Sequence, residues 1–476
     1  MTVEGKKILI VGIARSGVAA ARLLASRGAM VIANDARPES ELRDAARELR
    51  ELGVMLSLGG HPESLFENAD LVVLSPGVPA DLAALESARR AGIEIISEPE
   101  LAGRFLRGRL IGVTGSNGKT TVTTLIGELM RAAGAEVIVG GNIGMPLTSL
   151  IEKSSERTWT VAELSSFQLE MIDSLRVHVA VVTNVTPDHL DRHGSFENYV
   201  RAKHRIFSNQ TEDDWAILNG QDHAVADMVS KLGVRSRKIY FSSQGRETPG
   251  GETRDIYVEG GRVITTMMTD YRGEMEAIKL EEIPLPGMHN VENVMTALAA
   301  TFCAMGTGTN DLPVLVESIK RFKGVEHRIE YVAEIDGIKF YNDSKATNVD
   351  STVKALESFE RNIIVILGGK DKGSDYSTLA PLIRQRVKQV ILIGAASEKI
   401  AEQLEGTGPM TRARSMQDAV LRAMEVATSG DTVLLAPACA SFDMFDNYEH
   451  RGRVFKEAVY TLASRLHSGW TGRLTN

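Results

Sequence analysis

The stretch Leu110-Ile-Gly-Val-Thr-Gly-Ser-Asn-Gly-Lys-Thr-Thr121 decides how the rest of the chain is interpreted. A short apolar run leads into a loop of small residues, and Lys119-Thr120-Thr121 then opens a predicted helix. Backbone N–H groups, a helix N-terminus and one ammonium converge there, which favours a bound triphosphate. The strict phosphate-loop pattern has Gly where Val113 stands, so this chain carries the shorter form Gly115-x-x-Gly118-Lys-Thr. An ordinary Gly-rich turn is the alternative.

Length and composition limit the possible classes of protein. A chain of 476 residues is too long for one core and indicates about three domains. No apolar run reaches the length of a membrane span, so we expect no membrane insertion and a cytoplasmic location. The net charge of -8 argues against a general nucleic-acid surface. Two cysteines, Cys303 and Cys439, offer neither a disulfide framework nor metal-ligand spacing.

The first hundred residues predict a parallel sheet covered by helices, because short β-branched runs alternate with helical segments from Lys6 to about Glu98. The first turn, Gly12-Ile-Ala-Arg-Ser-Gly17, is close to the dinucleotide fingerprint, and Asp35 ends the next strand. Ala14 stands where Gly would let the backbone approach a pyrophosphate, which favours a nucleotide diphosphate other than NAD. A plain turn without a ligand remains the alternative. Ser75-Pro-Gly-Val78 adds a second loop at the same edge.

A second series begins after Glu98-Pro99-Glu100 with the phosphate loop. One predicted strand ends in Glu163, and another ends near His189. Residues that follow parallel strands share one crevice, so we expect both side chains to face the phosphate loop. An acid in that place can hold Mg²⁺ together with the loop hydroxyl of Thr120. A solvated strand end for Glu163 and a hydrogen-bonded loop residue for His189 are the alternatives.

Three further features belong to this middle part of the chain. The segment 195–207 predicts a helix with Lys203 among other basic residues, which on composition is a solvated face. Alternation of apolar and polar residues from Trp215 to about Tyr271 predicts an antiparallel flap. Asn290 and Asn293 lie on one face of a predicted helix and could bind a base, with helix capping as the alternative.

A third series of strands and helices starts beyond Phe322-Lys-Gly324. Its loops 342–348, 368–373 and 437–441 each follow a predicted strand, and they are rich in lysines and hydroxyl groups. Such an edge suits a small dicarboxylate or a phosphate. The sequence thus predicts an α/β chain of three domains: a Rossmann-like domain over 1–98, a central phosphate-loop ATPase-type domain over 99–324 and a Rossmann-like domain over 325–476. This organisation suggests an ATP-driven joining enzyme.

The assembled motifs resemble those of the Mur ligases over the whole chain. In order they are Thr114-Gly-Ser-Asn-Gly-Lys-Thr-Thr121, Gly141-Asn-Ile-Gly144, Glu163-Leu-Ser-Ser-Phe-Gln168, 184–191, 287–293, His327-Arg328 and 342–348. Within the family, the second and third motifs and Pro437-Ala-Cys-Ala-Ser441 resemble the members that add D-glutamate. The Asp-Asn-Pro-Arg motif of the diaminopimelate-adding relatives is absent from this sequence.

The resemblance implies an ATP-dependent acid–amino-acid ligase of cytoplasmic peptidoglycan precursor synthesis. Such an enzyme would join D-glutamate to UDP-N-acetylmuramoyl-L-alanine through an acyl phosphate. ATP and Mg²⁺ at two sites are the implied cofactors, with Lys203 carbamylated by CO₂. The expected partners are these small molecules, with no nucleic acid, and the expected state is a monomer.

The resemblance also implies roles for individual residues. Those implied in catalysis are Lys119, Glu163, His189 and Lys203, and Thr120 joins the last three as a metal ligand. Those implied to bind ATP are Gly115, Ser116, Asn117, Gly118, Lys119, Thr120, Thr121, Asn290, Asn293, Arg328 and Asp343. Those implied to bind substrate are Asp35, Arg37, Ser75 and Gly77 for UDP, Asn142 and Ser165 for the muramoyl part, and Lys345, Thr347, Lys372, Ser441 and Tyr448 for D-glutamate. Lys370 remains an alternative to Lys372, and Tyr448 stands where the family usually has Phe.

Three other functions are weighed against this one. A folylpolyglutamate-synthase-like enzyme has similar chemistry but lacks a domain like Gly12 to Glu98. A nucleotide-sensing protein without turnover would not need Lys119, Glu163, His189 and Lys203 together. A nicotinamide dehydrogenase rests on the first turn alone and would show a change in cofactor absorbance.

Overall fold

The computed structural model describes residues 1–246 and 254–467. They form three sheets in two compact units, the first made of Met1–Glu282 and Glu292–Lys320, the second of Ile283–Val291 and Arg321–Asn476. The predicted α/β class with mainly parallel sheets is therefore confirmed. The domain boundaries placed after residues 98 and 324 stay predictions.

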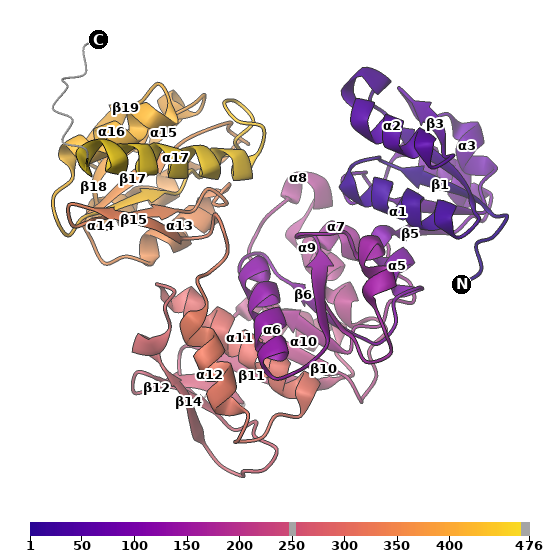
Figure 1. Cartoon of the computed structure of the whole chain (residues 1–476), viewed down its shortest axis with the longest axis horizontal. Helices are drawn as coiled ribbons and strands as arrows, with labels where there is room; N and C mark the ends of the chain where they lie inside the picture. Colours follow the sequence, from indigo (N-terminus) through magenta and orange to yellow (C-terminus); the bar gives the residue numbers. More distant parts are fainter. Residues whose placement is uncertain (247–253, 468–476) are drawn as a thin grey trace. The chain divides into compact units, whose positions relative to one another are not determined.

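The N-terminal sheet has five parallel strands in the order β3-β2-β1-β4-β5 (Figure 1). Its strands are β1 (Lys7–Val11), β2 (Met30–Asp35), β3 (Met55–Leu58), β4 (Leu71–Leu74) and β5 (Ile95–Ser97). The connecting segments are α1 (Arg15–Ser26), η1 (Glu39–Glu41), α2 (Arg43–Glu51), α3 (Glu63–Glu67) and α4 (Ala83–Arg90). Alternate residues of β1 enter two separate apolar clusters, Ile8 with α1 and α2, Leu9 with α3 and α4. Both faces of the sheet are therefore buried, which explains the continuous apolar run.

The central sheet has nine strands in the order β14-β13-β12-β11-β10-β9-β6-β8-β7. They are β6 (Arg109–Thr114), β7 (Val137–Gly141), β8 (Trp159–Glu163), β9 (Val179–Val182), β10 (Trp215–Asn219), β11 (Arg237–Ser242), β12 (Ile256–Glu259), β13 (Arg262–Thr265) and β14 (Met275–Lys279). The accompanying helical segments are α5 (Glu98–Gly103), α6 (Lys119–Ala132), η2 (Leu147–Lys153), α7 (Ser166–Leu169), α8 (Leu190–His193), α9 (Phe196–His204), η3 (Arg205–Phe207), α10 (His223–Leu232), η4 (Leu280–Glu282), α11 (Met288–Met305) and α12 (Leu312–Arg321).

The expectation of an antiparallel flap from Trp215 to Tyr271 is wrong for the first half of that stretch. β10 and β11 pair in parallel with each other, and β10 pairs in parallel with β9, so both extend the central sheet. Antiparallel pairing starts only between β12 and β13 and continues to β14. The helix α10 between β10 and β11 supplies the crossover that a parallel pair needs. Residues 247–253 of the stretch lie outside the described part.

The C-terminal sheet has six strands in the order β15-β16-β20-β17-β18-β19. They are β15 (Glu330–Ile335), β16 (Ile338–Asn342), β17 (Ile363–Leu367), β18 (Val387–Leu392), β19 (Met410–Arg412) and β20 (Thr432–Leu435), parallel apart from the β15–β16 hairpin. The helical segments are α13 (Val349–Glu357), η5 (Tyr376–Leu379), α14 (Ala380–Arg386), α15 (Ser397–Gln403), α16 (Met416–Val426) and α17 (Tyr448–His467). The short strands β15 and β19 were not predicted.

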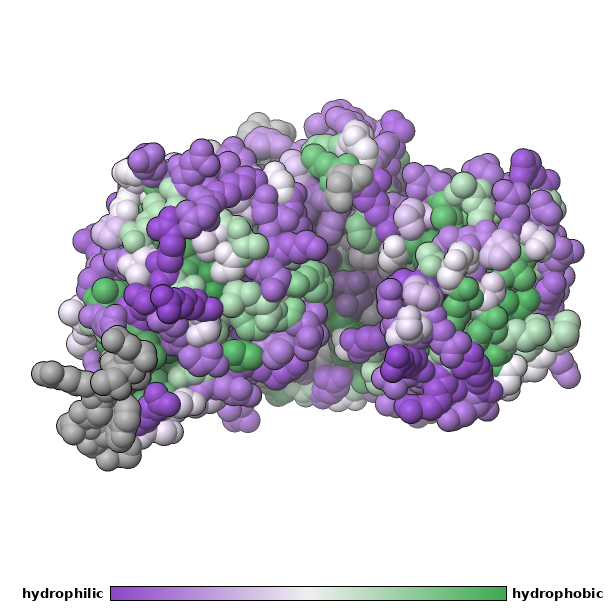
Figure 2. All heavy atoms as spheres, turned by 90° about the horizontal axis from the view of Figure 1, so that it is seen from above, coloured by the Kyte–Doolittle hydropathy of each residue, from purple (hydrophilic) through white to green (hydrophobic). Residues whose placement is uncertain are grey.

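The surface is mixed in character. On the face shown in Figure 2, hydrophobic side chains are interspersed with hydrophilic ones. Among the described helices, none is both long enough and apolar enough to span a bilayer.

Candidate active site

The loop between β6 and α6 has a backbone that only glycine fits at two positions. Gly115 has φ 144° and Gly118 has φ 83°, both in the region that L side chains rarely adopt. A Cβ on Gly115 would overlap Thr183 Oγ1, and a Cβ on Gly118 would overlap Asn293 Oδ1. The loop is thus a tight cradle against β9 and α11, and Asn293 lies beside it.

Lys119 turns back over this cradle. Its Nζ donates to the carbonyl oxygens of Gly115 at 2.9 Å and Ser116 at 2.8 Å. The other loop residues are fixed from the end of β9: Ser116 Oγ donates to Thr186 O at 2.8 Å, and Asn117 N donates to Asn184 Oδ1 at 2.8 Å. The ammonium therefore lies against a loop whose conformation these hydrogen bonds fix. Thr121, next to Thr120 in α6, is buried.

Glu163 lies beside the loop, as expected from its place at the end of β8. Its Oε2 accepts from Thr120 Oγ1 at 2.7 Å, and its Oε1 accepts from Asn142 Nδ2 at 2.8 Å. The carboxylate is only 1% exposed, because β8 lies between β6 and β7. An acid, a hydroxyl and an amide from three segments thus meet at one edge of the sheet.

Lys203 is not on a solvated face, contrary to the interpretation of its segment from composition. Its side chain is 1% exposed, and Nζ donates to Gly115 O at 2.7 Å. The ammonium lies 4.4 Å from the centroid of the Tyr199 ring. Burial, together with the nearby charge of Lys119, holds the pKa of Lys203 well below its usual value. Lys203 lies on the same buried side of α9 as Tyr199 and Ala202, which the charges of the segment do not indicate.

His189 occupies the position before α8 with φ 52°, and its side chain is 46% exposed. Its Nε2 lies 3.6 Å from Asp188 Oδ2, and its ring meets the edge of Phe167 with 4.9 Å between centroids. Phe167 follows Ser165, whose hydroxyl caps α7 in a reciprocal pair with Gln168. The contacts described for Ser165 are thus those of a capping residue.

The predicted nucleotide edge of the N-terminal sheet is also tightly built. Asp35 accepts from Ile13 N at 3.0 Å and from Arg37 Nε at 3.0 Å and NH2 at 2.8 Å. Burial alone would raise the pKa of Asp35, but these hydrogen bonds outweigh it and lower the pKa to about 2. Ser75 Oγ donates to Gly12 O at 2.6 Å, and Gly77 is exposed in the same loop. The two loops therefore lie together at one edge.

In the second unit, the predicted D-glutamate residues gather around β16 and β20. Lys345 Nζ donates to Tyr448 OH at 2.8 Å, and Thr347 N donates to Lys345 O at 2.7 Å. Lys370 exchanges two backbone hydrogen bonds with Ala440, next to the buried Ser441. Lys370 and Lys372 both have exposed side chains, so the choice between them stays open.

A buried arginine that sequence reasoning missed joins these loops. Arg451 is 1% exposed, and its NH2 donates to Ser344 O at 2.7 Å while NH1 donates to Cys439 O at 3.1 Å. It therefore holds the 342–348 loop against the 437–441 loop. Its place on α17, beyond every motif, gave no signal in the sequence.

The predicted ATP residues outside the phosphate loop are mostly buried. Asn290 Nδ2 donates to Pro286 O at 2.7 Å, so this side chain is tied to the turn before α11. Asp343 is buried at the end of β16; burial raises its pKa to about 7, against the opposing charge of Arg328. Arg328 belongs to the turn before β15, where its backbone N donates to Val325 O at 3.0 Å.

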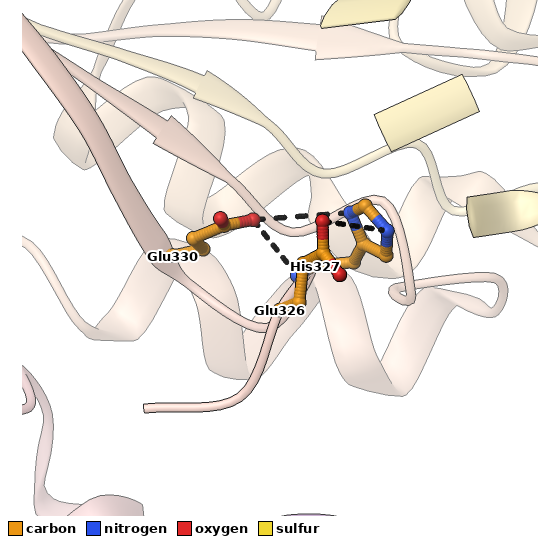
Figure 3. A group of neighbouring side chains, drawn as sticks. All are labelled: Glu326, His327 and Glu330. Carbon is orange, nitrogen blue, oxygen red and sulfur yellow. Dashed lines mark hydrogen bonds and ion pairs between the residues drawn. The ribbon is translucent and has the colours of Figure 1, made fainter. Parts of the chain in front are cut away.

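A cluster of Glu326, His327 and Glu330 has the composition of a metal site (Figure 3). However, Lys456 Nζ donates to Glu326 Oε1 at 2.6 Å and to Glu330 Oε1 at 2.9 Å, so one ammonium already pairs with both carboxylates. Asn342 Nδ2 lies 2.9 Å from His327 Nδ1 and donates to Glu330 Oε2 at 3.0 Å. We interpret the cluster as support for the 342–348 loop.

This chain is similar to known proteins over nearly its whole length. Three family models match: "Mur ligase MurD-like, N-terminal domain" over residues 6–97, "Mur ligase middle domain" over 113–301 and "Mur ligase, glutamate ligase domain" over 327–439. Two similar proteins are named UDP-N-acetylmuramoylalanine–D-glutamate ligase. The one from Acidobacterium capsulatum is 47% identical over 99% of both chains, and the one from Koribacter versatilis is 45% identical over 98% of this chain and 99% of its own.

Solved structures with a similar fold are more distant in sequence. A pseudomurein peptide ligase type C from Methanothermus fervidus aligns with a TM-score of 0.58 at 20% identity, covering 96% of this chain and 100% of its own. The UDP-N-acetylmuramate-alanine ligase MurC from Thermotoga maritima aligns with a TM-score of 0.57 at 20% identity and the same coverage. These two similarities concern the fold alone.

Proposed function

This chain belongs to the Mur ligase family, and from that premise we propose that it uses ATP to join D-glutamate to UDP-N-acetylmuramoyl-L-alanine. The relatives that carry this activity in their names match nearly the whole chain at 45 to 47% identity. The structural observation that carries the proposal is the convergence of two lysines, Lys119 and Lys203, on the carbonyl oxygen of Gly115 beside the buried Glu163.

The residues present fit a triphosphate and Mg²⁺. The two glycines let the loop backbone pass close to Thr183 and Asn293, and the ammonium of Lys119 turns back over the loop. Thr120 and Glu163 offer a hydroxyl and a carboxylate, which are hard oxygen ligands of the kind Mg²⁺ prefers. When bound there, Mg²⁺ would neutralise charge on the phosphoryl group that is transferred.

The chain's own groups then account for the first step. The carboxylate of the alanyl residue attacks the γ-phosphorus of ATP, the bond to the β,γ-bridging oxygen breaks, and ADP leaves. An acyl phosphate remains. In this proposal, the Lys119 ammonium and the loop N–H groups other than those of Ser116 and Asn117 stabilise the negative charge on the γ-phosphoryl oxygens.

The second step forms the amide bond. The amine of D-glutamate attacks the acyl carbon, the amine loses a proton, and the tetrahedral intermediate expels inorganic phosphate. We assign D-glutamate to the edge formed by Lys345, Thr347, Ser441, Tyr448 and one of Lys370 and Lys372. Cationic and hydroxyl groups there match a dicarboxylate.

We also propose that Lys203 reacts with CO₂. Burial lowers the pKa of the Lys203 amine, and this favours its unprotonated, nucleophilic form. The nitrogen forms a bond to the carbon of CO₂ and releases one proton, which turns a cation into a carboxylate-like anion. With Glu163 and His189, this group would complete a second Mg²⁺ site. The position of Lys203 supports the proposal, because its amine is buried and close enough to Glu163 for that carboxylate to influence its pKa.

The remaining binding residues are assigned from the resemblance to the family. The UDP part is assigned to Asp35, Arg37, Ser75 and Gly77, and the muramoyl part to Asn142 and Ser165. The rest of ATP is assigned to Asn290, Asn293, Arg328 and Asp343. A cytoplasmic monomer without nucleic-acid partners completes the proposal.

The decisive experiment measures phosphate release from ATP with UDP-N-acetylmuramoyl-L-alanine, comparing D-glutamate, L-glutamate and diaminopimelate as the amine. We expect release with D-glutamate only, and none from the Lys119→Ala variant, which controls for contaminating ATPase. Release with diaminopimelate instead would keep the acyl-phosphate chemistry but contradict the proposed amine. No release with any amine would favour a binding protein without turnover.

A further inference from the structure

Arg192 connects the loop after β4 with α8, the helix that follows His189. It lies in α8, three residues after His189, and its side chain is 18% exposed. Its NH1 donates to Pro76 O at 3.0 Å, and its NH2 donates to Val78 O at 2.8 Å. Both acceptors belong to the loop after β4, to which we assign the nucleotide end of the substrate.

The same guanidinium packs against the ring that contacts His189. Its carbon lies 4.1 Å from the centroid of Phe167, and His189 meets the edge of that ring at 4.9 Å. His193 stacks on Phe167 with centroids 5.3 Å apart and an angle of 23° between the planes. Phe167, four residues after Glu163, is therefore contacted by Arg192, by His189 just before α8 and by His193 at the end of α8.

The helix α8 is held as one small rigid piece. At its end, His193 Nε2 lies 3.0 Å from Ser166 Oγ, and His193 Nδ1 lies 3.1 Å from Glu170 Oε1. At its start, the backbone N–H groups of Arg192 and His193 both donate to His189 O at 3.1 Å. A displacement of Arg192 would therefore carry the backbone of His189 with it.

The contacts of Arg192 extend beyond its charge partner. Glu170 lies 3.5 Å from its NH2 and already balances its charge. The two further hydrogen bonds go to carbonyl oxygens of the loop after β4, a strand of the N-terminal sheet. A guanidinium can make such a forked contact, and an ammonium cannot. The position of that loop and the position of α8 are thus mechanically linked.

We propose that Arg192 is a positioning residue that transmits occupancy of the 75–78 loop by a uridine nucleotide to α8 and thereby to His189. Nucleotide binding would favour the loop position in which both carbonyls accept from Arg192, and this would restrict α8. The inference rests on the proposed function, because it assumes that the nucleotide part of the substrate binds this loop.

The test is backbone hydrogen exchange of the full chain with and without UDP, which needs no turnover. In the unmodified protein we expect UDP to slow exchange at Val78 and, by about tenfold, at the N–H groups of residues 192–194 in and after α8. In Arg192→Ala we expect UDP to slow exchange at Val78 alone. Arg201→Ala, an exposed arginine of α9, is the matched control and should behave as the unmodified protein does.

Each outcome distinguishes the inference from its premise. Protection of α8 by UDP in Arg192→Ala, or its absence in the unmodified protein while Val78 is protected, would overturn the coupling. Failure of UDP to protect Val78 in the unmodified protein would contradict the nucleotide site itself. If Arg192→Ala does not fold, Arg192→Lys takes its place, because it keeps the charge over Phe167 and loses the fork.

A kinetic readout separates positioning from folding. With UDP-N-acetylmuramoyl-L-alanine, we expect Arg192→Ala to lower kcat about tenfold while the KM for ATP changes less than about twofold. A general loss of folded enzyme would also lower the total rate and leave each KM unchanged, so kcat is calculated from the concentration of folded enzyme, measured separately for each variant. Unchanged kcat would count against the inference.

Discussion

At the scale of single residues, the site depends on two lysine side chains that approach one carbonyl oxygen. Lys119 and Lys203 both donate to Gly115 O, yet the environment gives them opposite roles. Lys119 lies at the surface of the loop, where a cation can meet phosphate. Lys203 is buried beside it, and the charge of Lys119 adds to the cost of protonating a second amine.

We expect Lys119→Ala to lower kcat by at least about a hundredfold, because charge on the γ-phosphoryl group loses its closest protein cation. The measurement is phosphate release at saturating substrates. Lys153→Ala, which removes an exposed lysine at the end of η2, is the control and should keep normal turnover. Near-normal rates in Lys119→Ala would remove the assigned role.

For Lys203→Ala we expect an inactive enzyme that regains part of its turnover when a short carboxylic acid is supplied in solution. The acid would restore the anion that the carbamate provides. Intact mass at neutral pH should show one added CO₂ in the unmodified chain and none in the variant. Glu197→Ala, an exposed residue in the first turn of α9, is the control. Full activity of Lys203→Ala would contradict the proposal.

Single residues were predicted from the sequence only where a strand set their position. Glu163 was placed near the loop because β8 ends there, and the structure brings it to Thr120. Composition alone predicts a solvated face for the segment of Lys203, because a helix with several basic residues does not reveal which of them points inward; only the resemblance to the Mur ligases gives Lys203 a role in the site. Arg192 and Arg451 were missed, since each acts on loops distant in the sequence.

At the scale of elements, α5 is the clearest case of a helix built from buried acids. Glu98 and Glu100 are both almost fully buried, yet their environments differ. Glu98 Oε1 accepts from Thr148 N and Oγ1 at 2.7 Å each, while its Oε2 has no partner among the described residues. Burial raises the pKa of Glu98 to about 7.

Glu100 shifts in the other direction. Burial would raise its pKa, but hydrogen bonds from Ser174, the backbone of Asp173 and Leu175, and the guanidinium of Arg104 outweigh it and lower the pKa. The two carboxyls are two positions apart on one helix. They therefore form a matched pair for a test of stability against pH.

We expect Glu98→Gln to raise the free energy of unfolding by about 2 kcal/mol at pH 8 and to change it little near pH 4.5. Between its ordinary pKa and about 7, the folded chain holds the Glu98 proton more tightly than the unfolded chain does. Stability from this group therefore falls as pH rises through that window, and Gln removes the fall. Thermal unfolding at both pH values measures it.

Glu100→Gln is the control with the opposite sign. Its carboxylate stabilises the fold when ionised, so the substitution should destabilise the protein by about 1 to 3 kcal/mol at pH 8 and by less at low pH. A loss of stability at pH 8 in Glu98→Gln would show that the ionised carboxylate is better accommodated than its burial indicates.

Elements were predicted well where the apolar run was continuous and badly where apolar and polar residues alternate. The strands with continuous apolar runs, such as β1 and β17, were found because both of their faces are buried. The alternation of apolar and polar residues in β10 and β11 resembles that of a hairpin and therefore predicts antiparallel pairing. The direction is instead decided by the helix α10 between them, which is the crossover connection of a parallel pair.

At the scale of the whole molecule, three sheets are distributed over two compact units, and the proposed ATP residues are found in both. The phosphate loop and Asn293 belong to the first unit, while Arg328 and Asp343 belong to the second. The sequence predicted the three sheets through three separate series of strands and helices. It could not predict how contacts group them, because that depends on side chains such as Leu101 and Ile151, which join the core of the N-terminal sheet.

The separation of the ATP residues gives the last prediction. A guanidinium is a strong partner for phosphate oxygens, and Arg328 is the cation that we assign to ATP outside the phosphate loop. We therefore expect Arg328→Ala to raise the KM for ATP about tenfold and the KM for UDP-N-acetylmuramoyl-L-alanine less than about twofold, with each substrate varied at saturation of the others. Arg328→Lys, which keeps the charge without the fork, should fall between. The exposed Arg361→Ala in the same unit controls for a general loss of cationic charge and should leave both constants unchanged. Equal increases in the two KM values would mean that Arg328 supports the folded unit and does not bind ATP.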